Sequence, residues 1–579
     1  MYEDDKMEED DEMVTGGHTT TNDYFDCPRP NGIPVDDFHL AVMVLATACN
    51  LSHTQYQALR ESLQLATLES IASLPETLST LRERVRRNMP LLKLRGHDLE
   101  MDLTKVPPKS KNPKKAYCFE MQQYAERWLH DDRICQSMHF GLGIIGQSRQ
   151  EFWHGDAWLG SIRTTSGDFA YIGDLPLLPS DCVSYFPTVR GITRITPTYL
   201  RIHGVGRLET SHGEPAVIAK RLLSLPELHR LWDIDWAQMQ PPLDTEVEEA
   251  APYFHAALPE LVLLDSDRLV IPVSELTKHE SIRLLDTSPD DTARILSGPP
   301  SHCVRYIVYL HNGIPTVRHI HQRHRIPAEQ ELLDFSREQA LKQFVIGKER
   351  RVSIPVTLFI DGFGLYRNTY KSIQGVYIQP ACLDEPGRFT LQNMWVLMIG
   401  PFGTDTTQIA KCLEMEGRAL GEGIKLANGD TLIMFPLCIT GDMPQQNQNA
   451  GVMSHLSRRG CRYCRIQTDN KGNLEYDIYR EGRYPQPEDN LFINIMSQNL
   501  SDSARGTVFA QHGISSNGHI FGTAFPSLNP FSAYPNDPMH VELRLAKYFH
   551  ECLMKDVFSK TGTDAYEAAW NRINVPYGW

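Results

Sequence analysis

The sequence predicts a multi-domain α/β protein whose C-terminal half holds a mixed β-sheet. The length of 579 residues exceeds that of one ordinary domain. Helical periodicity dominates the first part of the chain, and short strand-like runs dominate the middle. After residue 350, apolar β-branched runs alternate with helix-like stretches, which is typical of a sheet covered by helices.

Composition excludes several classes of protein. No apolar run approaches the ~20 residues of a membrane span. The acidic start, MYEDDKMEEDDEM, lacks the features of a signal peptide, so we expect an intracellular protein without a membrane partner. The 12 cysteines are scattered, which argues against a disulfide scaffold. The net charge of -15 argues against a protein that simply coats DNA, although a nuclease also gathers carboxylates at its metal site.

Five regions follow from these patterns. Residues 1–35 read as a disordered acidic tail. Residues 36–150 read as helical with a basic patch, either a helix-turn-helix or an ordinary bundle. Residues 151–285 predict a small β-rich barrel or sandwich. Residues 286–350 form a connecting α/β region, and 351–579 form the core that carries the chemistry.

Basic side chains gather in the helical region and in the Pro-rich stretch that follows it. They are either DNA contacts or a solvated face and linker. The residues assigned to DNA contact are Arg84, Arg86, Arg87, Lys109, Lys111, Lys114 and Lys115.

The core has a definite order of expected elements. Strands are expected at 352–360, 372–383, 393–400 and 431–440, with one helix at 406–423 before the last strand and another at 445–457 after it. Three antiparallel strands, a helix and a fourth strand that pairs beside the first make up the plan of an RNase H-like sheet. The core is therefore expected to be RNase H-like.

Two of these strands end at an aspartate, Asp361 and Asp442. If the first and fourth strands are neighbours, both carboxylates come to one end of the sheet. Carboxylates on rigid strands can share two divalent ions, and hard oxygen ligands suit Mg²⁺ or Mn²⁺. The alternative is that each Asp, being next to a glycine, is only a turn residue.

A Cys-x-x-Cys pair, Cys461 and Cys464, follows the second helix. Such a pair is half of a structural zinc site or a redox pair. Asp537 and His540 supply the other half of the zinc site, with His455 and His512 as substitutes. Alternatively, Asp537 only caps a helix. That helix carries an apolar stripe expected to dock it on the core, made of Val541, Leu545, Tyr548, Cys552 and Leu553.

Three blocks in this order resemble the transposases of CACTA-type elements and of the fungal Kyakuja–Dileera–Zisupton and Plavaka groups. The blocks read FIDGFGLYRN, GDMPQQNQNAGVMSHLSRRGCRYC and DPMHVELRLAKYF. The resemblance covers about residues 350–579. It implies catalytic roles for Asp361 and Asp442 and a third acidic residue, a Glu, well downstream of the last block.

That third residue is where the chain departs from the family. The sequence ends at Trp579, soon after the last block, so either Glu542 or Glu551 serves instead or the family Glu is absent. We favour absence, because Glu542 follows His540 so closely that it should face outward. The chain is then expected to be a truncated or decayed copy with weakened metal binding and strand transfer.

The expected function is that of a nuclear transposase that cleaves transposon ends and joins them to target DNA. It would use Mg²⁺ or Mn²⁺ for catalysis and Zn²⁺ for structure. The sequence leaves open whether the protein forms a homo-oligomer. The alternative is a non-catalytic DNA- or chromatin-binding protein derived from a transposase. A cellular RNase H-like nuclease has less support, since no feature reads an RNA–DNA hybrid.

Overall fold

The computed structural model divides the chain into two units, Met1–Lys93 and Leu94–Trp579. The structure describes residues 37–49, 51–64, 76–88, 92–99, 115–147, 149–189, 192–193, 195–210, 212–233, 258–284, 300–320, 327–328, 331, 341–345, 349–364, 372–401, 404–536 and 538–570. The expected acidic tail at 1–35 lies outside these residues.

The first unit is a small helical unit. Its helices are α1 (Asp37–Ala48), α2 (His53–Gln64) and α4 (Leu78–Asn88). Their buried faces meet in one apolar cluster made of Val42, Ala46, Tyr56, Leu78 and Leu81. The sequence grouped two later helices with this unit, α5 (Met121–His130) and α6 (Asp132–Gln136), but both belong to the second unit.

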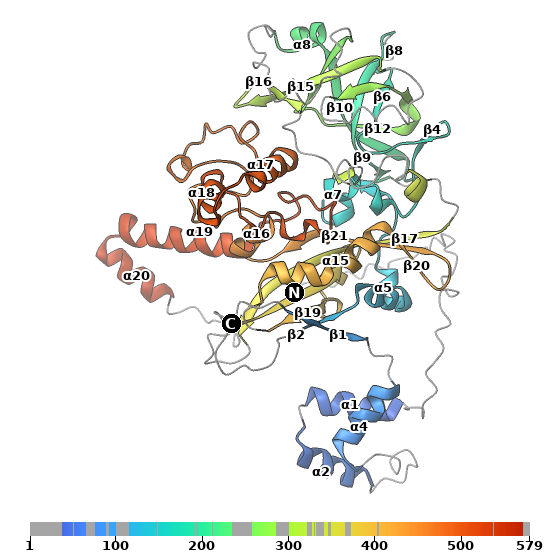
Figure 1. Ribbon diagram of the computed structural model, residues 1–579, viewed down its shortest axis with the longest axis vertical. Coiled ribbons are helices and arrows are strands. Elements are labelled where there is room, and N and C mark those ends of the chain that lie inside the picture. The colour runs from blue at the N-terminus through green and yellow to red at the C-terminus, as the bar shows by residue number, and fades with distance from the viewer. Residues whose placement is uncertain are drawn as a thin grey trace, which may run out of the picture. The chain divides into compact units, whose positions relative to one another are not determined.

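A seven-stranded mixed sheet forms the centre of the second unit (Figure 1). Its order is β1-β2-β19-β18-β17-β21-β20. The strands span Leu94–Asp98 (β1), Lys115–Phe119 (β2), Arg351–Gly364 (β17), Ser372–Pro380 (β18), Trp395–Gly400 (β19), Ile424–Lys425 (β20) and Thr431–Thr440 (β21). The hairpin β1-β2 extends the sheet from a part of the sequence that we had assigned to helices.

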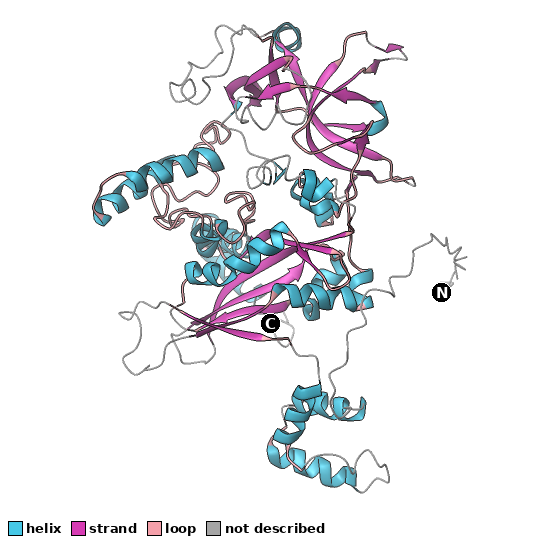
Figure 2. Cartoon of the chain, turned by 45° about the vertical axis from the view of Figure 1, so that its right-hand side comes forward, coloured by secondary structure: helices cyan, strands magenta, loops and turns pink. Residues whose placement is uncertain are grey.

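The central strands β17 and β21 are largely buried, as their apolar composition predicts. Ile354, Leu358 and Ile360 of β17 have no exposed surface. Helices α5 (Met121–His130) and α15 (Thr406–Glu422) contact each other, because the Gln122 backbone N–H donates to the Glu416 carboxylate at 3.1 Å. Helices lie against the strands of this sheet (Figure 2). Such a sheet between covering layers is the α/β architecture that the sequence predicts.

A second, ten-stranded sheet curls into an open half-barrel (Figure 1). Its main path is β13-β6-β9-β10-β11-β15-β14, with β12 beside β10, β16 beside β15 and β3 beside β9. The strands span Gly143–Ile145 (β3), Cys182–Tyr185 (β6), Thr198–Leu208 (β9), Pro215–Ser224 (β10), Glu260–Leu264 (β11), Leu269–Pro272 (β12), Leu276–His279 (β13), Ile282–Leu284 (β14), His302–His311 (β15) and Ile314–His319 (β16).

This curled sheet runs past the boundary at residue 285 that the sequence suggested. Strand β15 pairs in parallel with both β11 and β14, so residues 302–319 complete the β-rich region instead of starting a connector. Two small hairpins and three helices lie within or next to this part of the chain. They are β4 (Tyr171–Ile172) with β5 (Leu175–Pro176), β7 (Thr188–Val189) with β8 (Ile192–Thr193), α6 (Asp132–Gln136), α7 (Asp156–Leu159) and α8 (Leu225–Trp232). The short helix α14 (Glu385–Phe389) lies between β18 and β19 of the seven-stranded sheet.

The helix after β21 is shorter than expected. Helix α16 spans Met443–Asn449 and ends before Gly451, whose φ of +70° turns the chain. A side chain at Gly451 would meet the backbone of Gly518 at 2.2 Å, so the close approach of these two segments ends the helix. Four more helices follow. They are α17 (Pro485–Ser497), α18 (Asp502–His512), α19 (Pro538–Cys552) and α20 (Lys560–Trp570).

The expected docking of α19 through its apolar stripe is wrong. Leu545 is 61% and Tyr548 is 67% exposed, and Cys552 and Leu553 are only half-buried. Helix α19 instead extends away from the sheet with α20 (Figure 1). Helical periodicity in a sequence shows that a helix has an apolar face, but it cannot show whether another element covers that face.

Truncation of a central β17 side chain tests this core. We expect Ile354→Ala to lower the free energy of unfolding by about 2–5 kcal/mol, because it leaves a cavity between buried strands. Ile195→Ala is the matched control, since Ile195 is 95% exposed. Urea denaturation would measure both variants, and equal midpoints would contradict the central place of β17.

Candidate functional site

Asp361 and Asp442 lie at the same end of two neighbouring strands. Strands β17 and β21 are parallel, with Leu358 opposite Ile439 and Phe359 opposite Thr440. In each strand, the aspartate lies two residues beyond the last of these paired residues. A side chain built on Gly441 would come within 2.9 Å of the Ile360 carbonyl oxygen, so the two chains remain close there. The expected pairing of the first and fourth strands is confirmed.

The Asp361 side chain is exposed. It lies opposite Gly375 of β18. A Cβ at Gly375 would meet the rings of Phe363 at 2.8 Å and Tyr377 at 3.0 Å. Glycine is therefore needed opposite Asp361, because the two rings occupy the space that a side chain would need.

The Asp442 carboxylate is half-buried and already makes one bond. It is the N-cap of α16, where its Oδ1 accepts from the Gln445 backbone N–H at 2.8 Å. The Gln445 side chain donates in turn to Thr406 and Asn449, both at 2.8 Å. This cap fixes the Asp442 carboxylate and leaves its second oxygen available to a ligand.

The two aspartates fit a hard divalent cation. Mg²⁺ is commonly held by one or two carboxylates together with substrate phosphates, and both residues supply oxygen ligands. Within the described residues, no three His, Cys, Asp or Glu side chains converge on one point. Glu542 is exposed on α19.

The Cys-x-x-Cys pair brings its two sulfur atoms to 3.5 Å. This is close to the ~3.8 Å between two thiolates at a tetrahedral zinc ion with Zn–S bonds of ~2.3 Å. The Cys464 thiol and the backbone N–H groups of Tyr463 and Cys464 donate to the Cys461 sulfur, and they hold the pKa of Cys461 well below its usual range. The pKa of Cys464 rises because it is the donor in this bond and is buried. One thiolate is therefore favoured at neutral pH.

Arg462 connects this pair to the other predicted site segments. It is 3% exposed and donates to the Asn447 side chain of α16 at 3.2 Å. It also donates to the Tyr534 carbonyl at 2.8 Å and to the Asn536 side chain at 3.0 Å. The chain directly before Asp537 is thus held beside the cysteine pair.

The second half of the expected zinc site is only partly visible. Asp537 lies outside the described residues, and of His540 only the backbone within α19 is described. Of the substitutes, His455 and His512 are described, and neither forms a three-member group with the two cysteines. Burial, together with Arg459 and Arg465, lowers the pKa of His512 and so favours its neutral ring.

A second buried arginine, Arg483, holds the backbone around the cysteine pair. It has no exposed side-chain surface and pairs with Glu488 at 3.0 Å. Its remaining N–H groups donate to the carbonyl oxygens of Arg459, Cys461, His512 and Gly513. The fixed donor geometry of a guanidinium thereby joins loops that are distant in sequence.

The residues assigned to DNA contact are only partly described. Arg84 is exposed on α4, and Lys115 begins β2 and pairs with Asp98 at 3.5 Å. Arg86 and Arg87 belong to α4, but their side chains are outside the described part. Lys109, Lys111 and Lys114 lie outside the described residues.

The structure also contains two hollows that the sequence did not predict. One, of about 540 Å³, lies between β10 and β21 and is lined by Ile218, Glu331, Phe435 and Leu528 among others. The other, of about 520 Å³, includes Arg459, Arg465 and Arg480. The arginines that surround the cysteine pair in RRGCRYCR were the only signal of the second hollow in the sequence.

No protein-family model and no curated protein matches this sequence. Across the part of the chain that the structure describes, none of the helices has the length and apolar character needed to cross a membrane.

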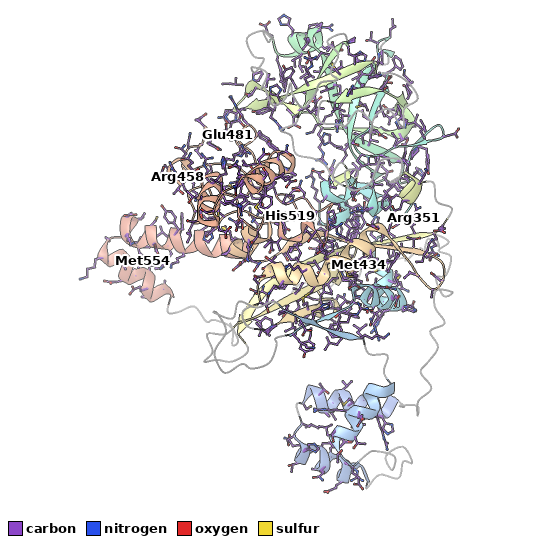
Figure 3. The ribbon with its side chains drawn as sticks, in the orientation of Figure 1. Arg351, Met434, Arg458, Glu481, His519 and Met554 are labelled. Atoms are coloured by element: carbon purple, nitrogen blue, oxygen red, sulfur yellow. The ribbon has the colours of Figure 1, made fainter. Side chains whose placement is uncertain are left out.

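The half-buried His519 (Figure 3) and the fully buried Tyr534 predict an acid-sensitive fold near this site. The His519 ring lies 2.7 Å from the Tyr534 hydroxyl, and burial lowers the pKa of His519 from 6.5 to about 3. The unfolded chain therefore binds the proton first, so the stability contribution is complete above pH 6.5 and is lost as the pH falls toward 3. We expect a loss of about 2 kcal/mol at pH 5.

The variant His519→Gln keeps a hydrogen-bonding side chain and removes this titration. Urea midpoints measured from pH 7 to 4 should fall less steeply for His519→Gln than for the wild type. His229→Gln, at an exposed position of α8, is the control. Identical slopes for all three proteins would contradict a buried neutral His519.

Proposed function

We propose that residues 351–579 form an RNase H-like core of transposase descent whose chemistry is metal-dependent DNA cleavage and strand transfer. The observation that carries this proposal is the position of Asp361 and Asp442 at one end of the parallel strands β17 and β21. The strand order β19-β18-β17-β21 supports it, because three antiparallel strands followed by a parallel fourth beside the first is the order of that fold.

The residues of the site would divide the work as follows. Asp361 and the free oxygen of Asp442 would hold Mg²⁺ or Mn²⁺, and the α16 cap would keep the second carboxylate in place. The bound ions would supply activation of a water or a 3′-hydroxyl and stabilisation of the leaving oxygen. The exposed position of Asp361 would leave room for a DNA phosphate.

A non-catalytic DNA- or chromatin-binding protein is the second candidate. The observation that favours it is the lack of a third convergent carboxylate among the described side chains. Glu542, the candidate for the third acidic residue, is exposed on α19. Two carboxylates alone would bind the ions weakly and cleave slowly. The proposed partner is DNA for the first candidate and DNA or chromatin for the second. Action in the nucleus and assembly into a homo-oligomer are proposed for both.

The proposed zinc site is structural. Cys461 and Cys464 would provide two thiolates, with Asp537 and His540 as the remaining ligands. Support comes from the 3.5 Å sulfur separation and from Arg462, which binds the residue before Asp537. Zinc there would fix the start of α19 to the loop after α16.

Replacement of the two aspartates tests the nuclease proposal. Asp361→Asn and Asp442→Asn should each reduce Mn²⁺-dependent nicking of supercoiled plasmid by roughly 100-fold, equivalent to about 3 kcal/mol of transition-state stabilisation. Asp405→Asn is a matched control, because Asp405 caps α15 as Asp442 caps α16. Its nicking rate should stay near that of the wild type.

Two results would reject the nuclease reading. Equal nicking rates for Asp442→Asn and Asp405→Asn would show that Asp442 acts only as a helix cap. Wild-type protein that binds DNA but never nicks it in Mn²⁺ would select the non-catalytic candidate.

Metal analysis tests the zinc site. The purified full chain should carry about one zinc ion, and Cys461→Ser and Cys464→Ser should each lose it. Cys49→Ser, at an exposed cysteine, is the control. Zinc-free wild-type protein with reactive thiols would favour the redox pair instead.

A further inference from the structure

A polar depression of about 520 Å³ lies beside the cysteine pair. Arginine and amide side chains provide most of its hydrogen-bond donors. They are Arg459, Arg465, Arg480, Gln467, Asn470 and Asn473. A hollow of this size accommodates a ligand group, and its donors select one rich in acceptor oxygens.

Two of the three guanidinium groups are available to a ligand. Arg465 is paired with Glu488 at 2.9 Å. Arg459 is half-buried and Arg480 is exposed, and neither makes an ion pair within the described part of the chain. A cationic side chain without a carboxylate partner retains its capacity for a charge-assisted bond to an anion.

The carboxylates that also line the depression are mostly engaged elsewhere. Asp477 accepts from the Tyr309 hydroxyl at 2.6 Å and from the backbone of Tyr479 and Arg480. Glu475 accepts from the Asn312 side chain at 2.7 Å. Both are thus held by the β15–β16 hairpin, and Glu481 is the remaining acidic group.

The backbone under these side chains is fixed to the cysteine pair. Arg465 N–H donates to the Glu481 carbonyl at 2.9 Å, and Arg483 N–H donates to the Tyr463 carbonyl at 2.9 Å. Cys464 and Gly482 form a β-bridge. The backbone that carries the donors is therefore fixed, so binding does not have to order these loops.

Further cations continue along the exposed rim. Lys471 is exposed, and the Arg458 side chain is 73% exposed with only a distant Asp469 partner at 3.9 Å. Figure 3 places Arg458 and Glu481 on the same outer side of the molecule. Repeated positive groups on an open rim suit an extended polyanion with regularly spaced phosphates better than one enclosed anion.

We propose that this depression binds backbone phosphates of DNA through Arg459 and Arg480. The choice of DNA as the polynucleotide rests on the proposed function. Guanidinium forks and side-chain amides contact phosphate oxygens without reading sequence, so the site would position the duplex and leave sequence choice to other residues.

The test is fluorescence anisotropy of the full-length protein with a labelled mixed-sequence DNA duplex over a range of NaCl. Arg459→Gln and Arg480→Gln should each weaken binding several-fold and reduce the slope of log K against log salt by about 1. Arg480→Lys should retain most of the slope, and Glu481→Gln should strengthen binding. Arg230→Gln, at an exposed arginine of α8, is the matched control.

Unchanged affinity and slope in both Arg→Gln variants, relative to Arg230→Gln, would overturn the proposal. Complete displacement of the duplex by inorganic phosphate at constant ionic strength would also overturn it, because it would indicate a single-phosphate site. Retention of the duplex under those conditions supports the polynucleotide assignment.

The same assay in Asp361→Asn/Asp442→Asn separates this inference from the nuclease proposal. Weakened binding by Arg480→Gln supports the phosphate site even where the wild type never nicks DNA. If the wild type nicks DNA but Arg459→Gln and Arg480→Gln bind DNA as tightly as the wild type, the phosphate site is rejected and the nuclease proposal stands.

Discussion

The parallel pairing of β17 with β21 is the constraint on which the candidate site depends. Both strands are buried, so their backbone groups must bond to each other, and the pairing of Phe359 with Thr440 sets the register. That register brings two aspartates from distant parts of the sequence to one sheet end.

Buried arginines hold together the irregular region after α16, as strand pairing holds the sheet. Few regular elements hold residues 450–484, yet Arg462 and Arg483 are almost wholly buried and donate to carbonyl oxygens from several loops. Removal of such a charge from water is costly unless every donor finds a partner, which explains the dense bonding around Arg483. The cysteine pair and the arginine-lined depression are both built on this frame.

Local patterns in the sequence located the core strands well and some helix ends poorly. Apolar β-branched runs predicted the four strands that became β17, β18, β19 and β21. Helix α16 ended early because Gly451 must approach Gly518, a contact between distant segments. The exposed face of α19 and the extension of the curled sheet to β16 were missed for the same reason, since packing partners are not encoded in local periodicity.

The sequence alone determined the α/β class, the order of the core elements and the candidate residues Asp361, Asp442, Cys461 and Cys464. These follow from residue type and spacing, which are local properties. Only the tertiary structure decided that the two strands are parallel neighbours, that Asp442 caps a helix and that Arg459 and Arg480 share a hollow with Arg465. Such relations join residues through space, and they arise because buried polar groups and apolar faces must be satisfied across the whole chain.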